Sequence, residues 1–264
     1  MSWRAELLAT YAVAARNTVM GVRNVFFFFE LLFWPIVGVL SIGLMSRFLE
    51  LTQAQASFVL VGTIALSVVN VCQLEVAYAV LLDVWSKSLK HQFLAPIGIR
   101  HLTLGSWIVG MVRSLAVFVL LAALGWWAFD FRVLQPGWLA LATFLLGCFL
   151  TAWVVGVAVC ALITLFGNRA EAFAWASVNM VLVLAGIYYP ISVLPDSIAM
   201  VAKAIPLTYF LDAYRAHYGF ESEFRFPIAT GLVLSVFYAV LAHWAFLAAI
   251  QRARRTGLLL KMSE

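Results

Sequence analysis

Charged side chains are scarce in this sequence. They make up 11% of its 264 residues, and hydrophobic residues make up 65%. A soluble domain carries about 25% charged residues. The mean hydropathy of +1.01 is correspondingly high. These values exclude a soluble globular domain and indicate an integral membrane protein.

Cysteine and histidine are also rare. The three cysteines, Cys72, Cys148 and Cys160, lie inside apolar stretches and have no paired spacing. Neither a disulfide framework nor a zinc site is therefore predicted. The four histidines are scattered, and none has a second ligand at a metal spacing. We expect no metal site in this chain.

Motifs that mark enzymes are missing from the sequence. It has no G-x-x-x-x-G-K-[ST] phosphate loop, so the chain cannot itself be an ATPase of that class. It has no H-E-x-x-H and no G-x-S-x-G motif either. An enzyme acting on lipids is disfavoured, because His, Asp and Ser do not cluster at a single membrane depth. We expect no catalytic residue and no bound cofactor.

Long apolar runs dominate what is present. A transmembrane helix takes about 20 residues, and the chain has room for about six such helices joined by short loops. We predict an all-α integral membrane fold with a single transmembrane domain over residues 25–251 and a tail over residues 252–264. The predicted transmembrane helices cover residues 25–46, 57–82, 104–129, 138–166, 172–188 and 228–250.

Basic residues divide unevenly between the two sides of these runs. The side that carries both termini and residues 83–103 has more Lys and Arg, so the positive-inside rule makes it cytoplasmic. We therefore predict a multi-pass protein of the cell inner membrane with both termini in the cytoplasm. The net charge of +5 is explained by these flanking residues, and no nucleic-acid partner is expected.

Residues 1–24 precede the first apolar run and show helical periodicity. Trp3, Leu7, Tyr11 and Val19 recur every three or four positions, and polar residues lie between them. The pattern predicts an amphipathic helix that lies at the cytoplasmic surface of the membrane. A solvated tail with chance periodicity is the alternative.

The connection over residues 83–103 carries apolar side chains on the cytoplasmic side. Trp85, Leu89, Phe93 and Leu94 fall at helical spacing among polar residues, and Pro96 would end the short helix. Apolar side chains on a cytosolic loop indicate either a docking ridge for a partner protein or packing against the membrane surface.

On the outer side, prolines interrupt the segment between the fifth and sixth runs. The prolines at 190, 195 and 206 preclude one continuous helix over residues 189–207. The sequence is consistent with a re-entrant hairpin that contains a short helix over residues 197–204, and equally with an ordinary structured loop.

Three charged residues lie within the apolar runs, where an ionised group normally has a partner or a water path. Glu75 lies about 12 Å from the cytoplasmic end of its helix and Arg113 about 13 to 15 Å from that of the next helix. We therefore hypothesise an ion pair between them. Glu30 lies nearer the surface and can extend its carboxylate there. A proton-driven secondary transporter, in which Glu30 or Glu75 titrates, is the alternative function.

The organisation resembles the permease subunit of type-2 ABC transporters, chiefly exporters. Trp34-Pro35 is similar to the family's proline in the first transmembrane helix. In the loop, Asp83 fits the family outline, but Val84, Lys87 and Lys90 replace the expected Arg, Gly and Glu. The most specific similarity lies near the outer hairpin, in Tyr188, Tyr189, Pro190, Leu194, Pro195, Pro206 and Arg215.

The resemblance implies that transport and ATP hydrolysis are carried out by different chains. A separate nucleotide-binding ATPase subunit would bind ATP and Mg, and two copies of the permease, as a homodimer, would form the transport path in membrane lipid. The path would lie between the copies, lined by the first, second and fifth transmembrane helices. Its substrate would be amphipathic: a drug-like compound, a lipid or a lipid-linked glycan. The residues that would contact the ATPase are Asp83, Trp85, Leu89, Phe93, Leu94 and Pro96.

Overall fold

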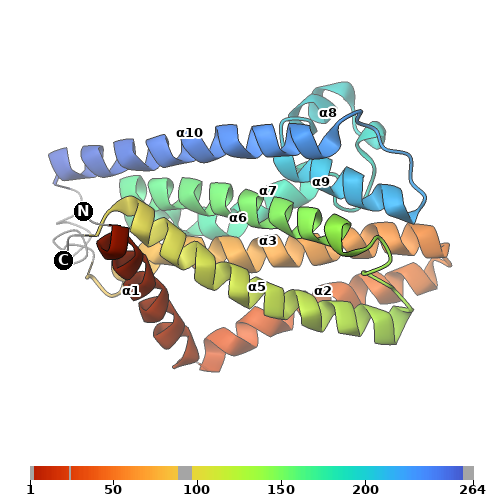
Figure 1. Cartoon of the computed structure of the whole chain (residues 1–264), viewed down its shortest axis with the longest axis horizontal. Coiled ribbons are helices and arrows are strands. Elements are labelled where there is room, and N and C mark those ends of the chain that lie inside the picture. Colours follow the sequence, from red (N-terminus) through yellow and green to blue (C-terminus); the bar gives the residue numbers. More distant parts are fainter. Residues whose placement is uncertain (1–2, 24, 89–96, 258–264) are drawn as a thin grey trace.

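The computed structural model of the chain describes residues 3–23, 25–88 and 97–257, which form helices and connecting turns (Figure 1). No strand occurs in these three ranges, and the predicted all-α membrane fold is confirmed. The helices are α1 (Trp3–Val22), α2 (Val25–Phe48), α3 (Gln53–Trp85), α5 (Ile99–Phe129), α6 (Trp138–Phe166), α7 (Glu171–Leu184), α8 (Asp196–Ala202), α9 (Pro206–Arg215) and α10 (Pro227–Arg255), with short 3₁₀ turns η1 (Gly167–Ala170), η2 (Ile191–Val193) and η3 (Ala216–Tyr218).

Within the described ranges, five helices are long and apolar enough to cross a bilayer: α2, α3, α5, α6 and α10. The fifth predicted transmembrane segment, residues 172–188, forms the shorter helix α7 instead. Its 14 residues reach about 21 Å at 1.5 Å per residue, less than the roughly 30 Å of a hydrocarbon core. The helix ends because Gly186 adopts a left-handed φ of +67° and Pro190 follows shortly after.

Helix α3 runs through the middle of the bundle and packs against α5, α6, α2 and α7 (Figure 1). Small residues allow its closest approaches. A Cβ on Gly110 of α5 would lie 2.9 Å from the carbonyl oxygen of Cys72, and one on Gly156 of α6 would lie 2.6 Å from Cβ of Val76. Such contacts hold helices together in a membrane, where lipid competes for apolar side chains.

Different helix ends and connections lie at the two ends of the bundle. Helix α1 begins and α10 ends at the same end as the connection between α3 and α5 (Figure 1). Helices α8 and α9 and the connection between α5 and α6 lie at the opposite end. The first end corresponds to the side that the basic residues predict to be cytoplasmic.

Helix α1 packs on α5 through the side opposite its predicted apolar face. Val13, Asn17 and Gly21 are buried, spaced four residues apart. Trp3 and Tyr11, on the predicted apolar face, are 70% and 71% exposed. The apolar face thus points away from the bundle, as an interfacial helix in contact with lipid requires.

The outer segment between α7 and α10 breaks at its prolines. Pro190 precedes η2, Pro195 precedes α8 and Pro206 is the first residue of α9. A proline is tolerated at a helix start because its missing N–H would have no intrahelical partner there. The short helix expected over residues 197–204 is α8.

Candidate functional site

The connection between α3 and α5 was predicted to contact a partner protein. Four of its predicted contact residues, Leu89, Phe93, Leu94 and Pro96, lie outside the described residues. Asp83, which is buried, and Trp85, which is exposed, lie in the last turn of α3. The described residues on either side of residues 89–96 therefore define the candidate site.

Helix α3 ends in a Schellman motif that sets the direction of the chain toward this segment. The N–H of Ser88 donates to the carbonyl of Asp83 at 2.9 Å, and the N–H of Lys87 donates to that of Val84 at 3.2 Å. Lys87 has the left-handed φ of +55° that the motif needs. The Ser86 hydroxyl donates to the carbonyl of Leu82 at 2.8 Å and lies 2.8 Å from the Ser88 hydroxyl.

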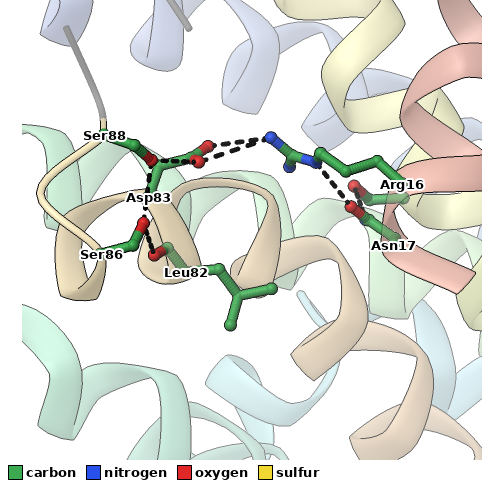
Figure 2. Close-up of polar contacts among 7 residues, drawn as sticks. Arg16, Asn17, Leu82, Asp83, Ser86 and Ser88 are labelled. Atoms are coloured by element: carbon green, nitrogen blue, oxygen red, sulfur yellow. Dashed lines mark hydrogen bonds and ion pairs between the residues drawn. The ribbon is translucent and has the colours of Figure 1, made fainter. Parts of the chain in front are cut away.

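A polar network then joins this helix end to α1, as Figure 2 shows. Arg16 Nη1 donates to Asp83 Oδ2 at 3.2 Å, and Arg16 Nε donates to Asn17 Oδ1 at 3.2 Å. The Ser88 hydroxyl donates to Asp83 Oδ1 at 2.9 Å. We call Arg16, Asn17, Asp83 and Ser88 the loop-end network. Because the Asp83 side chain is 11% exposed, its carboxylate needs these donors.

The other side of the segment is also tied to α1. His101, buried in the first turn of α5, lies with Nε2 at 2.8 Å from Glu6 Oε2, and Arg100 Nη2 donates to Glu6 Oε1 at 3.4 Å. Since His101 Nδ1 accepts the N–H of Gly98 at 2.9 Å, Nε2 carries the proton and donates to Glu6. This hydrogen bond, with the charge of Arg100, lowers the pKa of Glu6.

Deeper in the bundle, α1 contacts the intramembrane charges. Glu75 and Arg113 form an ion pair, and Arg113 Nη2 donates to the carbonyl of Asn17 at 3.1 Å. The Asn17 side chain donates to the hydroxyl of Ser106 at 2.8 Å. Gly21 leaves space for the guanidinium, because a Cβ there would lie 1.9 Å from Arg113 Nη2. One helix thus touches both sides of residues 89–96 and the buried ion pair.

Trp85 links the end of α3 to α7. Its indole Nε1 donates to Glu171 Oε2 at 3.2 Å, and Glu171 is the first residue of α7. A negative charge is favourable at a helix N-terminus. The end of α3 therefore contacts α1 on one side and α7 on the other.

A cavity of about 620 Å³ opens between α2, α3 and α7. Trp34, Asn70, Trp175 and Tyr188 are among its lining residues. A smaller cavity of about 40 Å³ shares Trp34, Asn70 and Trp175 with it and is also lined by Glu75. The walls come from the first, second and fifth predicted transmembrane segments. The side chain of Glu30 lies outside the described part of the chain.

Arg215 holds the outer segment together. Its guanidinium donates to the carbonyls of Gly186 at 2.7 Å, Ile187 at 2.5 Å and Phe58 at 3.0 Å. These bonds fasten the broken end of α7 to α3 and α9. Tyr189, Pro190, Pro195 and Pro206 lie in the same segment, and the Tyr189 hydroxyl donates to the carbonyl of Val183.

Sequence reasoning missed Glu6, Arg16, Asn17, His101 and Glu171 as site residues. Arg16 is 67 positions from Asp83, and Glu6 is 95 positions from His101. No local spacing marks such pairs. Among the described residues, no group of three or more His, Cys, Asp or Glu side chains is arranged to hold a metal ion.

A comparison with protein-family models matches residues 9–218 to the family described as ABC-2 type transporter. No curated protein matches the chain. The matched range includes most of α1 and all of α2 to α9. It therefore contains the loop-end network, the buried ion pair and most of the outer segment.

Proposed function

Because the chain belongs to the ABC-2 type transporter family and is a multi-pass membrane permease, we propose that it is the permease subunit of an ATP-driven exporter. A separate ATPase chain supplies ATP hydrolysis and binds ATP and Mg. Two permease copies form the transport unit in the inner membrane, with both termini in the cytoplasm. The substrate is amphipathic: a drug-like compound, a lipid or a lipid-linked glycan.

The observation that carries this proposal is the attachment of α1 to both sides of residues 89–96. On one side Arg16 donates to Asp83, which also accepts from the Ser88 hydroxyl, and on the other side Glu6 accepts from His101. A partner that displaces this segment would move α1 together with α3 and α5. Because Arg113 bonds to α1, the displacement would reach the Glu75–Arg113 pair within the membrane.

A partner changes the permease conformation only if it binds one arrangement better than the other. A partner bound at residues 89–96 would distinguish the two arrangements, because α1 is bonded on both sides of this segment. Helices α3 and α5 would therefore have to move together with α1. The cavity between α2, α3 and α7 supports an amphipathic substrate, since Trp34 and Trp175 offer apolar faces and Asn70 offers a polar group.

The proton-driven alternative is less well supported. A proton carrier at Glu75 would have to break its ion pair with Arg113 in each cycle, leaving a buried guanidinium without its counter-ion. The pair favours a structural role for Glu75.

The proposal is tested by co-expressing the chain with candidate ATPase subunits and measuring co-purification and vanadate-sensitive ATP hydrolysis. The variants Leu89→Asp and Phe93→Asp should abolish both. Phe48→Asp is the matched control, because Phe48 is 85% exposed and is the last residue of α2, a helix that ends at the opposite end of the bundle (Figure 1). If no candidate ATPase binds the wild-type chain, or if the control loses binding equally, the proposed coupling segment is wrong.

A further inference from the structure

A third cavity, of about 150 Å³, is lined by residues of α9 and of the connection before α10, which lie at the end of the bundle opposite the loop-end network (Figure 1). Its lining includes two phenylalanine rings, three carboxylate side chains and one guanidinium: Phe58, Phe220, Asp212, Glu221, Glu223 and Arg215. They come from α3, from α9 and from the connection before α10. The site described above uses Arg215 alone among these side chains.

Arg215 has one donor that the fold does not satisfy. The residue is 5% exposed, and its two Nη atoms donate to three backbone carbonyls. Its Nε has no hydrogen-bond partner among the described residues. A buried N–H of a charged group without a partner is costly. A ligand group that accepts a hydrogen bond in this cavity would remove that cost.

The charges around the cavity select against an anion. The carboxylates of Asp212, Glu221 and Glu223 outnumber the single guanidinium of Arg215 and repel a negative group. An ammonium group has no lone pair and cannot accept from Nε–H of Arg215. Asp212 already accepts from the hydroxyl of Ser222 and, at 3.0 Å, from the N–H of Glu223. A neutral hydroxyl suits both kinds of group, since it accepts from Nε–H and donates to a carboxylate.

The size and the apolar surface of the cavity further restrict which ligands it can bind. The rings of Phe58 and Phe220 are 5.0 Å apart between centroids, in an edge arrangement. They provide apolar surface beside the polar groups. A cavity of about 150 Å³ is large enough to hold one six-membered ring.

We propose that this cavity binds one neutral sugar ring, with a ring hydroxyl between the Arg215 guanidinium and the surrounding carboxylates and with apolar C–H groups against Phe220. The site is independent of the ATPase partner, because it lies at the other end of the bundle. The sugar is either a free glycan or the headgroup of a glycolipid, and both present the same ring.

The test uses the full chain in phosphatidylcholine nanodiscs, prepared without glucoside or maltoside detergents, which would occupy the site. Saturation-transfer NMR measures binding of methyl β-D-glucopyranoside and of glucuronate as an anion. The neutral glycoside should bind about tenfold more tightly than glucuronate. Phe220→Ala should weaken it roughly tenfold. Phe226→Ala is the matched control, because Phe226 lies in the same connection and is 64% exposed outside the cavity.

A second arm replaces part of the lipid with a monoglucosyl diacylglycerol. Displacement of methyl glucoside by this lipid would identify a glycolipid headgroup as a ligand, whereas unchanged binding would restrict the site to free glycans. Absence of saturation transfer to the neutral glycoside, equally tight binding of glucuronate, or equal losses in Phe220→Ala and Phe226→Ala would each overturn the proposal. Failure of ATPase assembly would leave it unaffected.

Discussion

The pair between Arg16 and Asp83 gives the sharpest test of the loop-end network. We consider Arg16→Ala, Asp83→Ala and the exchanged pair Arg16→Asp with Asp83→Arg. Arg16 Nη1 lies 3.2 Å from Asp83 Oδ2, and the side chains are 32% and 11% exposed. The pair is neither free in solvent nor fully buried, so its net contribution lies between the two limits.

The magnitude follows from this geometry. At an effective dielectric constant of about 20, two charges about 3.2 Å apart attract by roughly 5 kcal/mol. Desolvation offsets most of this attraction, and the exposure of Arg16 reduces it further. A net contribution of about 1 to 2 kcal/mol to the docking of α1 remains. Its loss would raise the undocked population of α1 by roughly 5- to 30-fold.

Ser106→Cys reports that population. Ser106 is fully buried and accepts from the Asn17 side chain, so a thiol at position 106 is accessible when α1 lifts from α5. In this background, labelling by N-ethylmaleimide should be roughly 5- to 30-fold faster in either alanine variant. The exchanged pair should recover at least part of the protection.

Two controls accompany this measurement. The chain without Ser106→Cys reports any labelling of the three native cysteines, all of which are buried. Arg4→Ala changes a charge on the same helix, outside the loop-end network. Unchanged labelling in both alanine variants would refute the reasoning, as would an exchanged pair no better protected than the single variants.

Three further outcomes follow from the same contacts. Glu75→Gln removes the counter-ion of the Arg113 guanidinium and should lower the free energy of unfolding by about 3 to 5 kcal/mol. The measurement is the thermal midpoint, which should fall in Glu75→Gln and be largely restored when Glu75→Leu is combined with Arg113→Met. The pKa of Glu6 is lowered in the folded chain from its ordinary 4.5. The bond of Glu6 to His101 therefore stabilises the fold above pH 4.5, and this stabilisation is lost as the pH falls through the lowered pKa. The difference in thermal midpoint between wild type and Glu6→Ala should vanish in acid. Arg215→Lys cannot reach three carbonyls with a planar fork and should destabilise the outer segment by about 2 to 4 kcal/mol, seen as faster proteolysis there.

Much of the fold could be predicted from the sequence because its signals are local. Apolar runs mark helices in a bilayer, and the run over residues 138–166 coincides with α6. Prolines mark helix starts, as Pro206 does for α9. The end of α7 was harder to predict, because the break at Gly186 is held by Arg215, 29 residues further along the chain.

The candidate site could be predicted only in part, for a related reason. Asp83 and Trp85 stood out because they begin the connection that was predicted to be cytoplasmic. The residues that hold Asp83 did not stand out, since Arg16 belongs to a helix that was predicted to lie at the membrane surface. Pairing across 67 positions depends on how α1 lies across the bundle. Helical periodicity predicts which residues share a face of a helix, but it does not predict which other helix packs against that face.

The orientation of α1 has a consequence for how the permease would move. Its apolar residues, such as Tyr11, face outward, and its polar residues face α3 and α5. Glu6, Arg16 and Asn17 resist its separation from the bundle. In the proposed coupling, a helix held in this way would follow α3 and α5 when a partner displaces the end of α3. Its hydrogen bond to Arg113 would then carry that displacement to the buried ion pair, beside the cavity between α2, α3 and α7.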